Sequence, residues 1–424
     1  MEVFALSVCV IGILIIITYD KEAYSPNRWI LFITALMLIT NISPQFGLSK
    51  ADVRAYAVIG VGTIGLVVGS LPFFIKIRRN VTSTVPKAKY LKKLNERRFL
   101  FFTVVMFVLM IIIGLRAIQI LLSGNTLLYV RANFSGEIID NSLLLMIHQY
   151  LLSPFIKAYV SITIANSFLG KFSIRNIVVG ILLIALYSIS DGSRYLFITT
   201  FFEIIIGFFV YKAVFKKEYK INPWARIGII ILAFMFGYIL IYITESRGST
   251  KSIFETVYIY FAGAVPFLGE KIKELQEYNV MTFGLAFFRG ILDPIKMIFN
   301  YARLGFLFPD LYSTMNQWYT ATDQSVYLGK VYFNAFVTPY YAFYMDFGYL
   351  GVFLGSFVYG YLGKICKSVV KSEPNVFTLS VLLLFMESVA SFMIRWQFGN
   401  YRYMLAYIWI FILFSRHKTK EQNV

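Results

Sequence analysis

The sequence is poor in charged residues, cysteine and histidine for its length. Only 15% of its 424 residues are Asp, Glu, Lys or Arg, whereas about 25% is usual in soluble domains. Two Cys and two His are too few for a disulfide framework or a structural zinc site. A water-soluble globular domain and a small stapled protein are therefore both excluded, and the high hydrophobicity excludes intrinsic disorder.

Motifs for nucleotide and protease chemistry are missing as well. The chain has no G-x-x-x-x-G-K-[ST], no H-E-x-x-H and no G-x-S-x-G, which are typical of phosphate-binding loops, zinc proteases and serine hydrolases. It also lacks the Asp-x-Asp pair that would hold a metal-bound nucleotide sugar. These absences argue against ATP hydrolysis and against a metal-bound nucleotide-sugar donor.

Apolar residues, in contrast, make up 58% of the chain, and they fall into long runs. A membrane-spanning helix needs about 20 mostly apolar residues. The sequence predicts an all-α, polytopic membrane protein, with residues 1–424 as a single transmembrane domain. We expect about eleven spans, near residues 3–19, 29–46, 56–75, 99–121, 143–168, 176–190, 195–211, 227–244, 348–363, 376–394 and 403–414.

The net charge of +18 is explained by topology rather than by a nucleic-acid partner. Residues 76–98 contain nine Lys and Arg with a single acid, and short basic loops stay on the cytoplasmic side. Fixing this loop inside places the other Lys-rich loops inside too, and it leaves bases and acids nearly balanced outside. We expect the N-terminus outside, the C-terminus in the cytoplasm, and contact between the basic face and membrane lipids.

One outer segment, residues 245–347, is large. Within it, 252–268 and 282–304 are predicted to form helices that lie on or dip into the membrane interface. Residues 331–347 are apolar enough for a twelfth span, but that span would move the Lys-rich C-terminal loops outside. Pro339 near their centre also interrupts helical hydrogen bonding. We therefore interpret 331–347 as re-entrant or interfacial.

Arginines gather where the outer loops meet the membrane. Arg194 lies in the turn Ser190–Arg194 between two predicted helices, and Arg247 follows a span. The planar guanidinium matches phosphate oxygens in a bidentate way, so these side chains are candidates for binding a lipid-linked diphosphate. The alternative is snorkelling or pairing with nearby acids. Further arginines on this side are Arg289, Arg303, Arg395 and Arg402.

Four ionisable residues fall inside predicted spans: His148, Lys157, Glu203 and Glu387. Such residues are costly in a bilayer and often functional. A proton or ion pathway and structural pairing, for example of Lys157 with Glu203 or Glu387, are equally compatible with the sequence. Tyrosines are dense in 301–349, beside Trp318, and their rings suit either sugars or the aromatic belt of a membrane.

The layout and two motifs resemble the Wzy-type polymerases of bacterial O-antigen and capsular repeat units. The motifs are the Ser-Asp-Gly-Ser-Arg turn at 190–194, and Asn334 to Tyr341 leading into Asp346–Gly351. The resemblance implies a bacterial inner-membrane enzyme with a GT-C-like or O-antigen ligase-like fold. It would join oligosaccharide units carried on undecaprenyl pyrophosphate, without a cofactor. Chain-length regulator and flippase proteins are then expected partners.

Such a reaction needs cations on the departing pyrophosphate and a base for the attacking hydroxyl. Our hypothesis assigns substrate binding to Arg194, Arg247, Arg289, Arg303, Asn334, Tyr340 and Tyr341. The candidate bases are Asp346, Asp191, Glu245 and His148. Two other functions stay open: an O-antigen ligase, which shares the layout, and a lipid-oligosaccharide flippase or secondary transporter, which would use the four ionisable residues inside the spans.

Overall fold

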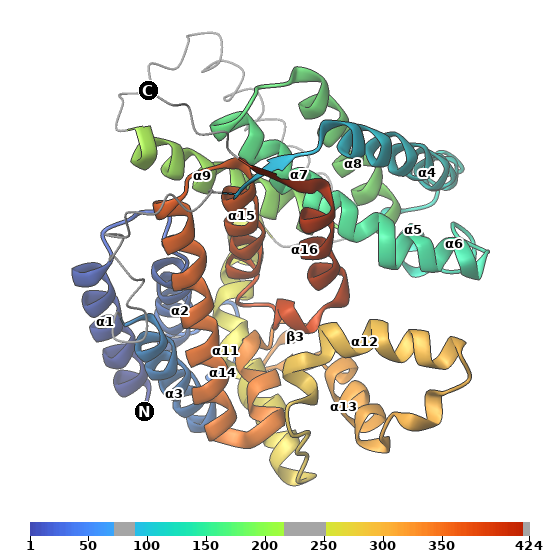
Figure 1. Cartoon of the computed structure of the whole chain (residues 1–424). Coiled ribbons are helices and arrows are strands. Elements are labelled where there is room, and N and C mark those ends of the chain that lie inside the picture. The colour runs from blue at the N-terminus through green and yellow to red at the C-terminus, as the bar shows by residue number, and fades with distance from the viewer. Residues whose placement is uncertain (72–89, 216–251, 419–424) are drawn as a thin grey trace. The chain divides into compact units, whose positions relative to one another are not determined.

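The computed structural model (Figure 1) describes residues 1–71, 90–215 and 252–418, and the chain folds into two compact units. Unit 1 consists of Met1–Pro86, Phe254–Val369 and Ser388–Met404, and unit 2 of Lys87–Ile253, Val370–Glu387 and Leu405–Val424. The described chain is mostly helical with little sheet, as predicted. Three helices contribute residues to both units: α14 (Thr338–Ser372), α15 (Val376–Ala390) and α16 (Tyr401–Leu413).

Unit 1 begins with three apolar helices and continues with the helices of the predicted outer segment. Its elements are α1 (Glu2–Tyr19), α2 (Pro26–Ile42), α3 (Val53–Ser70), α11 (Ile253–Glu277), α12 (Leu285–Tyr301), α13 (Asp310–Ala321), the strands β2 (Val326–Leu328) and β3 (Val331–Phe333), and most of α14. Two 3-10 turns, Gly305–Leu307 and Gln397–Gly399, complete it. The predicted helices at 252–268 and 282–304 are confirmed as α11 and α12.

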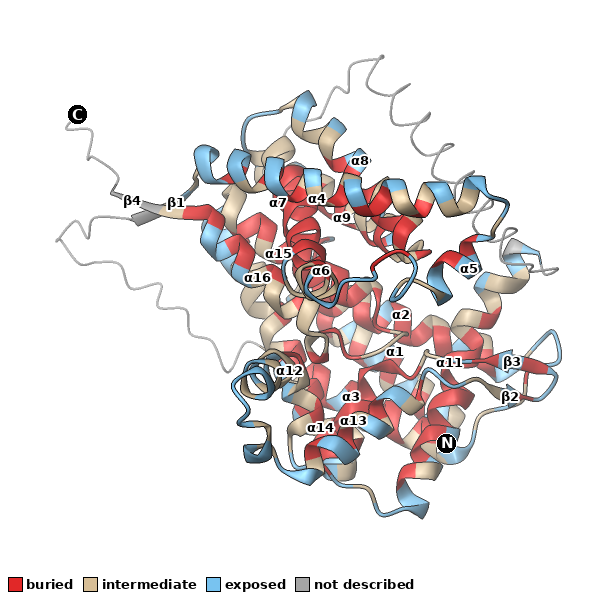
Figure 2. Cartoon of the chain, turned by 90° about the vertical axis from the view of Figure 1, so that its right-hand side faces the viewer, coloured by how far each residue is buried: buried red, intermediate tan, exposed pale blue. Residues whose placement is uncertain are grey.

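Unit 2 is built around α7 (Ser153–Leu169), in which every residue from Ser153 to Ala165 is buried (Figure 2). The other elements are β1 (Tyr90–Leu94), α4 (Glu96–Leu122), α5 (Leu127–Ala132), α6 (Ser142–Ile147), a π-helical turn (His148–Leu152), α8 (Ile174–Asp191), α9 (Tyr195–Phe215) and β4 (Phe414–Lys418). The strands β1 and β4 pair in antiparallel register. The sequence predicted a cytoplasmic loop for the first segment, and the end of a span with a cytoplasmic tail for the second.

In the described part of the chain, seven helical segments are long and apolar enough to cross a membrane: 2–19, 53–70, 96–122, 142–169, 174–191, 195–215 and 338–372. Three shorter apolar helices, α2, α15 and α16, coincide with further predicted spans. The eleventh predicted span, 227–244, lies outside the described residues. The described chain is therefore mostly helical and rich in apolar helices, as a membrane protein requires, while the number of spans stays a prediction.

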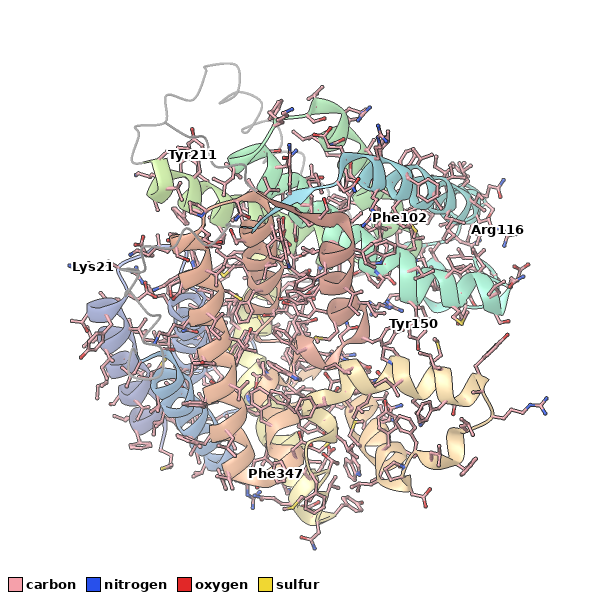
Figure 3. The ribbon with its side chains drawn as sticks, in the orientation of Figure 1. Lys21, Phe102, Arg116, Tyr150, Tyr211 and Phe347 are labelled. Carbon is pink, nitrogen blue, oxygen red and sulfur yellow. The ribbon has the colours of Figure 1, made fainter. Side chains whose placement is uncertain are left out.

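The segment 331–347 does not form one element. Residues 331–333 are β3, and α14 begins at Thr338 with Pro339 in its first turn. Pro339 therefore occupies a position where no N–H is needed. We had expected it to interrupt the centre of a helix, and this was wrong. The break comes at Phe347 and Gly348, where α14 kinks and Gly348 has a φ of 58°; Phe347 is labelled in Figure 3.

Small residues let α3 and α14 approach closely within unit 1. A Cβ on Gly65 would lie 2.4 Å from the carbonyl oxygen of Phe353, and one on Gly69 would lie 2.1 Å from that of Phe357. The Gly65-x-x-x-Gly69 motif thus serves close helix packing inside one chain.

We expect Gly69→Ala to destabilise the protein by about 1–3 kcal/mol, because the methyl group would overpack the contact with α14. Thermal unfolding of the full chain in detergent measures this. Gly60→Ala on the same helix is the matched control, since its Cβ would meet only the Phe4 ring at 3.6 Å. Equal melting temperatures for the two variants would contradict the close packing.

Candidate functional site

Helix α12 has two different faces. Phe288, Ile291, Ile295 and Ile298 follow one another at intervals of three and four residues, and all four side chains are exposed. Such a stripe is typical of a helix lying in a membrane interface. Arg289 and Asp293 lie one turn apart on the other side of the helix and form an ion pair of 3.4 Å. The polar side therefore turns towards α13 and the 397–399 turn.

Arg289 is held on every branch of its guanidinium group. Its Nε donates to the amide oxygen of Asn316 on α13 at 3.0 Å. Its Nη1 donates to the carbonyl of Gly399 at 3.4 Å, and its Nη2 faces Asp293. A long side chain fixed in this way loses little further entropy when it binds an anion. Gly290 allows the close approach, because a Cβ there would lie 2.2 Å from the carbonyl oxygen of Phe398.

Tyr319 lies between two guanidinium groups. The Arg289 group is 4.3 Å and the Arg395 group 6.0 Å from the ring centroid, within the range of cation–π attraction. The Tyr319 hydroxyl donates to the carbonyl of Trp396 at 3.2 Å, and burial raises the pKa of Tyr319. The ring thus serves as a neutral platform for two cations.

Two carboxylates and a lysine complete this group of side chains. Asp323 pairs with Arg395, Asp293 accepts a hydrogen bond from Tyr312, and Lys296 lies 4.4 Å from the Tyr312 ring centroid. The three cations outnumber the two carboxylates, so the group can attract an anion. We call it the arginine–tyrosine cluster: Arg289, Asp293, Lys296, Tyr312, Asn316, Tyr319, Asp323 and Arg395.

Asp346 caps the N-terminus of the helix that carries Arg289. Its carboxylate accepts hydrogen bonds from the backbone N–H groups of Ala286 at 3.0 Å and Phe287 at 2.8 Å, and from the Thr282 hydroxyl at 2.5 Å. Helices leave such N–H groups without internal partners. The kink of α14 frees the carbonyls of residues 345 and 346, and these accept from the N–H groups of Thr282 and Phe283. Asp346 therefore fixes where α12 starts.

The other predicted binding residues of unit 1 lie in different surroundings. Tyr340 and Tyr341 are each 1% exposed, and the Tyr341 hydroxyl donates to the carbonyl of Trp318 at 3.1 Å. Arg303 is exposed just after α12, with a φ of 59°. Asn334 is exposed and donates to the carbonyl of Asp323 at 3.2 Å. Their roles in substrate binding stay predictions, and for the two tyrosines the observed contacts are those of a protein core.

The predicted residues of unit 2 lie at helix ends and at an irregular turn. Asp191 is the last residue of α8, and Gly192 terminates that helix in the left-handed conformation, with a φ of 58°. Arg194 directly precedes α9. The tight turn predicted at 190–194 is therefore confirmed. Glu245 and Arg247 lie outside the described residues.

His148 is completely buried at the start of the π-helical turn. Its ring stacks on Tyr187 with centroids 5.8 Å apart, and the Phe134 ring lies at 4.8 Å. Pro154 explains the irregular turn, because it has no N–H to continue the helix and it crowds the preceding residues. The Ser153 N–H instead donates to the carbonyl of His148, five residues back. His148 is thus enclosed by aromatic rings, and its role as a base stays a prediction.

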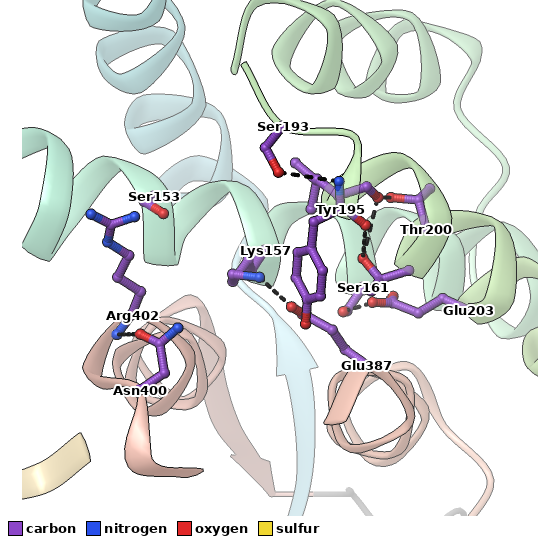
Figure 4. A network of polar contacts seen from close by, with 12 residues as sticks. Ser153, Lys157, Ser161, Ser193, Tyr195, Thr200, Glu203, Glu387, Asn400 and Arg402 are labelled. Atoms are coloured by element: carbon purple, nitrogen blue, oxygen red, sulfur yellow. Dashed lines mark hydrogen bonds and ion pairs between the residues drawn. The ribbon is translucent and has the colours of Figure 1, made fainter. Parts of the chain in front are cut away.

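A second polar group lies among the apolar helices of unit 2 (Figure 4). Lys157 forms an ion pair with Glu387, and its ammonium group lies 4.8 Å from the Tyr195 ring centroid. Glu203 accepts a hydrogen bond of 2.8 Å from the Ser161 hydroxyl. Of the two pairings expected for Lys157, the structure shows the one with Glu387. All three ionisable side chains are less than 10% exposed.

Four members of the cluster were not predicted as site residues: Asp293, Lys296, Asn316 and Asp323. Tyr312 and Tyr319 were predicted only as part of the tyrosine-rich stretch, and Arg395 only as one of the outer arginines. One signal was available, because Arg289 and Asp293 have the spacing of four that pairs side chains on a helix. No local signal joins Arg395 to Asp323, which lies 72 residues away in the sequence. In the described part of the chain, no group of three His, Cys, Asp or Glu side chains could hold a metal ion.

Comparisons with protein-family models, with curated proteins and with solved structures found no match to this chain.

We expect Asp346→Ala to lower stability by about 1–2 kcal/mol, because α12 would lose its cap. Asp346→Asn should cost less, since the amide oxygen can still accept a hydrogen bond. Thermal unfolding in detergent gives both values. Wild-type stability of the alanine variant would show that Asp346 does not hold α12.

We expect Lys157→Met to destabilise the protein by about 3–5 kcal/mol, because Glu387 would be left as an unpaired buried charge. The double variant Lys157→Met/Glu387→Gln should recover most of this loss. Melting temperatures of the wild type, both single variants and the double variant complete the cycle. A double variant no more stable than the worse single variant would argue against a mainly structural pair.

Proposed function

We propose that this protein is a membrane glycosyltransferase that polymerises oligosaccharide repeat units carried on undecaprenyl pyrophosphate. The site of action is the outer face of the bacterial cytoplasmic membrane, with the N-terminus outside and the C-terminus in the cytoplasm. The proposal includes about eleven spans in a GT-C-like or O-antigen ligase-like arrangement. It rests on the resemblance of the sequence motifs, and the arginine–tyrosine cluster supports it.

The observation that carries the proposal is the pair of guanidinium groups around Tyr319. Both belong to segments that the charge distribution predicts to lie outside the membrane. Arg289 is only partly enclosed, with 16% of its side chain exposed, so its remaining surface is open to a ligand. Two guanidinium groups at fixed positions suit the oxygens of a diphosphate. The exposed apolar stripe of α12 would keep this pair close to the headgroups, where a lipid-linked substrate arrives.

In the proposed step, the bond between the anomeric carbon of the growing chain and its pyrophosphate oxygen breaks. The pyrophosphate leaves with the electron pair, and Arg289 and Arg395 stabilise its charge. The acceptor hydroxyl of the incoming unit forms the new glycosidic bond and gives up its proton. We propose Asp323 as the base, because its side chain is 56% exposed within the cluster. Asp346 then acts as a positioning residue through α12.

Aromatic side chains next to the cluster suit the sugar part of such a substrate. The Trp318 and Tyr278 rings lie 5.3 Å apart, and Tyr278 is 70% exposed. Trp318 directly precedes Tyr319, the central ring of the cluster, on α13. Aromatic rings offer sugars an apolar face with polar tips at its rim.

A transporter is the second candidate function, and a specific observation favours it. The Lys157–Glu387 ion pair and the neighbouring Glu203 are buried among apolar helices, where ionisable residues often serve ion or proton movement. The pairing itself is equally expected of a structural role. An O-antigen ligase remains the alternative within the same enzyme class.

We expect a source strain that lacks this protein to make surface polysaccharide with single repeat units only. A gel of the surface polysaccharide shows this as the collapse of the ladder to one step. Long chains that stay on the carrier lipid would indicate a ligase instead. The absence of any unit from the outer face would indicate a transporter.

In the complemented strain, we expect Arg289→Lys and Arg395→Lys each to reduce polymer formation on the order of a hundredfold, because the bidentate fork is lost while the charge remains. Lys273→Ala is the control: Lys273 is 50% exposed on α11 and pairs with Glu277. Membrane levels of all variants are measured by immunoblot. Full ladders from both arginine variants at normal levels would refute the assigned role.

A further inference from the structure

Unit 2 contains a cavity of about 380 Å³ between α4, the end of α7 and the start of α8. This volume lies within the range of small-molecule sites. Polar and apolar residues occupy different parts of the wall. All three charged residues and most other polar ones come from the helix ends and the α7–α8 loop: Glu96, Asn166, Lys171, Ser173, Arg175 and Asn176. The exception is Thr103 on α4, whose hydroxyl donates to the carbonyl of Phe99 at 2.6 Å.

The polar end carries two cations on a fixed loop. The Asn166 side chain donates to the carbonyl of Lys171 at 2.8 Å and accepts from its N–H at 3.2 Å. Ser173 caps α8 by accepting a 3.4 Å hydrogen bond from the N–H of Asn176. Within the described residues, neither Lys171 nor Arg175 takes part in an ion pair. The Lys171 ammonium group and the Arg175 guanidinium group are therefore available to an anion.

The apolar end follows α4 into the predicted membrane. Phe99, Leu100, Val104 and Phe107 line it, and Leu100 and Val104 are 46% and 54% exposed. Phe99 stacks on Tyr159 of α7, with ring centroids 5.0 Å apart, and this contact fixes its side chain in the cavity wall. At 1.5 Å per residue, the wall from Glu96 to Phe107 is about 16 Å long. The polarity of the cavity thus changes along one helix, from a charged end to an apolar end.

We propose that this cavity binds an anionic phospholipid of the adjoining leaflet, with its phosphate between Lys171 and Arg175 and an acyl chain along α4. The charges fit this occupant, because two cations and the single carboxylate of Glu96 leave one positive charge for one phosphodiester. The length and gradient of the wall fit an amphiphile that enters from the bilayer. The predicted topology places this end at the cytoplasmic leaflet.

Native mass spectrometry of the full chain in detergent tests the proposal. The probes are phosphatidylglycerol, diacylglycerol and glycerol 3-phosphate, which separate the whole lipid from its apolar part and from its phosphate. We expect a one-lipid adduct with phosphatidylglycerol only. Lys171→Ala/Arg175→Ala should weaken it about thirtyfold, since two cations at about 1 kcal/mol each give about 2 kcal/mol. Val104→Trp should abolish the phosphatidylglycerol adduct, because the indole would fill the apolar end of the cavity while Lys171 and Arg175 are unchanged.

Lys93→Ala/Arg97→Ala is the matched control, because it removes two exposed cations of the same unit that do not line the cavity. It should leave the adduct unchanged. An equal loss in this control would mean that lipid is held by general surface charge, and the proposal would be wrong. Equal binding of diacylglycerol would overturn the role of the phosphate. Equal binding of glycerol 3-phosphate would overturn the role of the lipid.

Discussion

Polar groups that leave water need a partner inside the protein, and this constraint governs both units. An unpaired N–H, carbonyl or charge in apolar surroundings costs several kcal/mol. In unit 1 the kink at Phe347 and Gly348 frees two carbonyls, and the chain before α12 satisfies them. In unit 2 Pro154 removes a helical donor, and a π-helical turn before it restores the pairing. At the α14 kink and at the π-helical turn, backbone groups that lose their regular helical partners thus form other hydrogen bonds.

The same constraint positions the arginine–tyrosine cluster. The Asp346 carboxylate satisfies the N–H groups at the start of α12, so it fixes the point from which that helix runs. Arg289 follows within the next turn, and its guanidinium is then held by Asn316, Gly399 and Asp293. Asp346, a candidate base from the sequence, thus holds the start of the helix that carries Arg289.

Much of the fold could be predicted because long apolar runs leave few alternatives to a helix. The same reasoning offered Glu203 and Glu387 as partners of Lys157, since a buried charge in an apolar helix needs an opposite one. The choice of Glu387 came only from the structure. The arginine–tyrosine cluster was only partly predictable. Its members come from α12, α13, the loop after α13 and the segment after α15, and contacts between such distant segments leave no local pattern. The antiparallel pairing of β1 with β4 escaped prediction for the same reason.

Charge serves different purposes in the two units. In unit 1 each cation of the cluster lies close to a carboxylate or an aromatic ring, so its geometry is fixed. At the charged end of the unit 2 cavity, Lys171 and Arg175 have no such partners within the described chain, although Asn166 fixes the backbone of their loop. The first arrangement suits the selective recognition of one group. The second suits an abundant ligand that needs only one negative charge and an apolar tail, which is what a bilayer supplies.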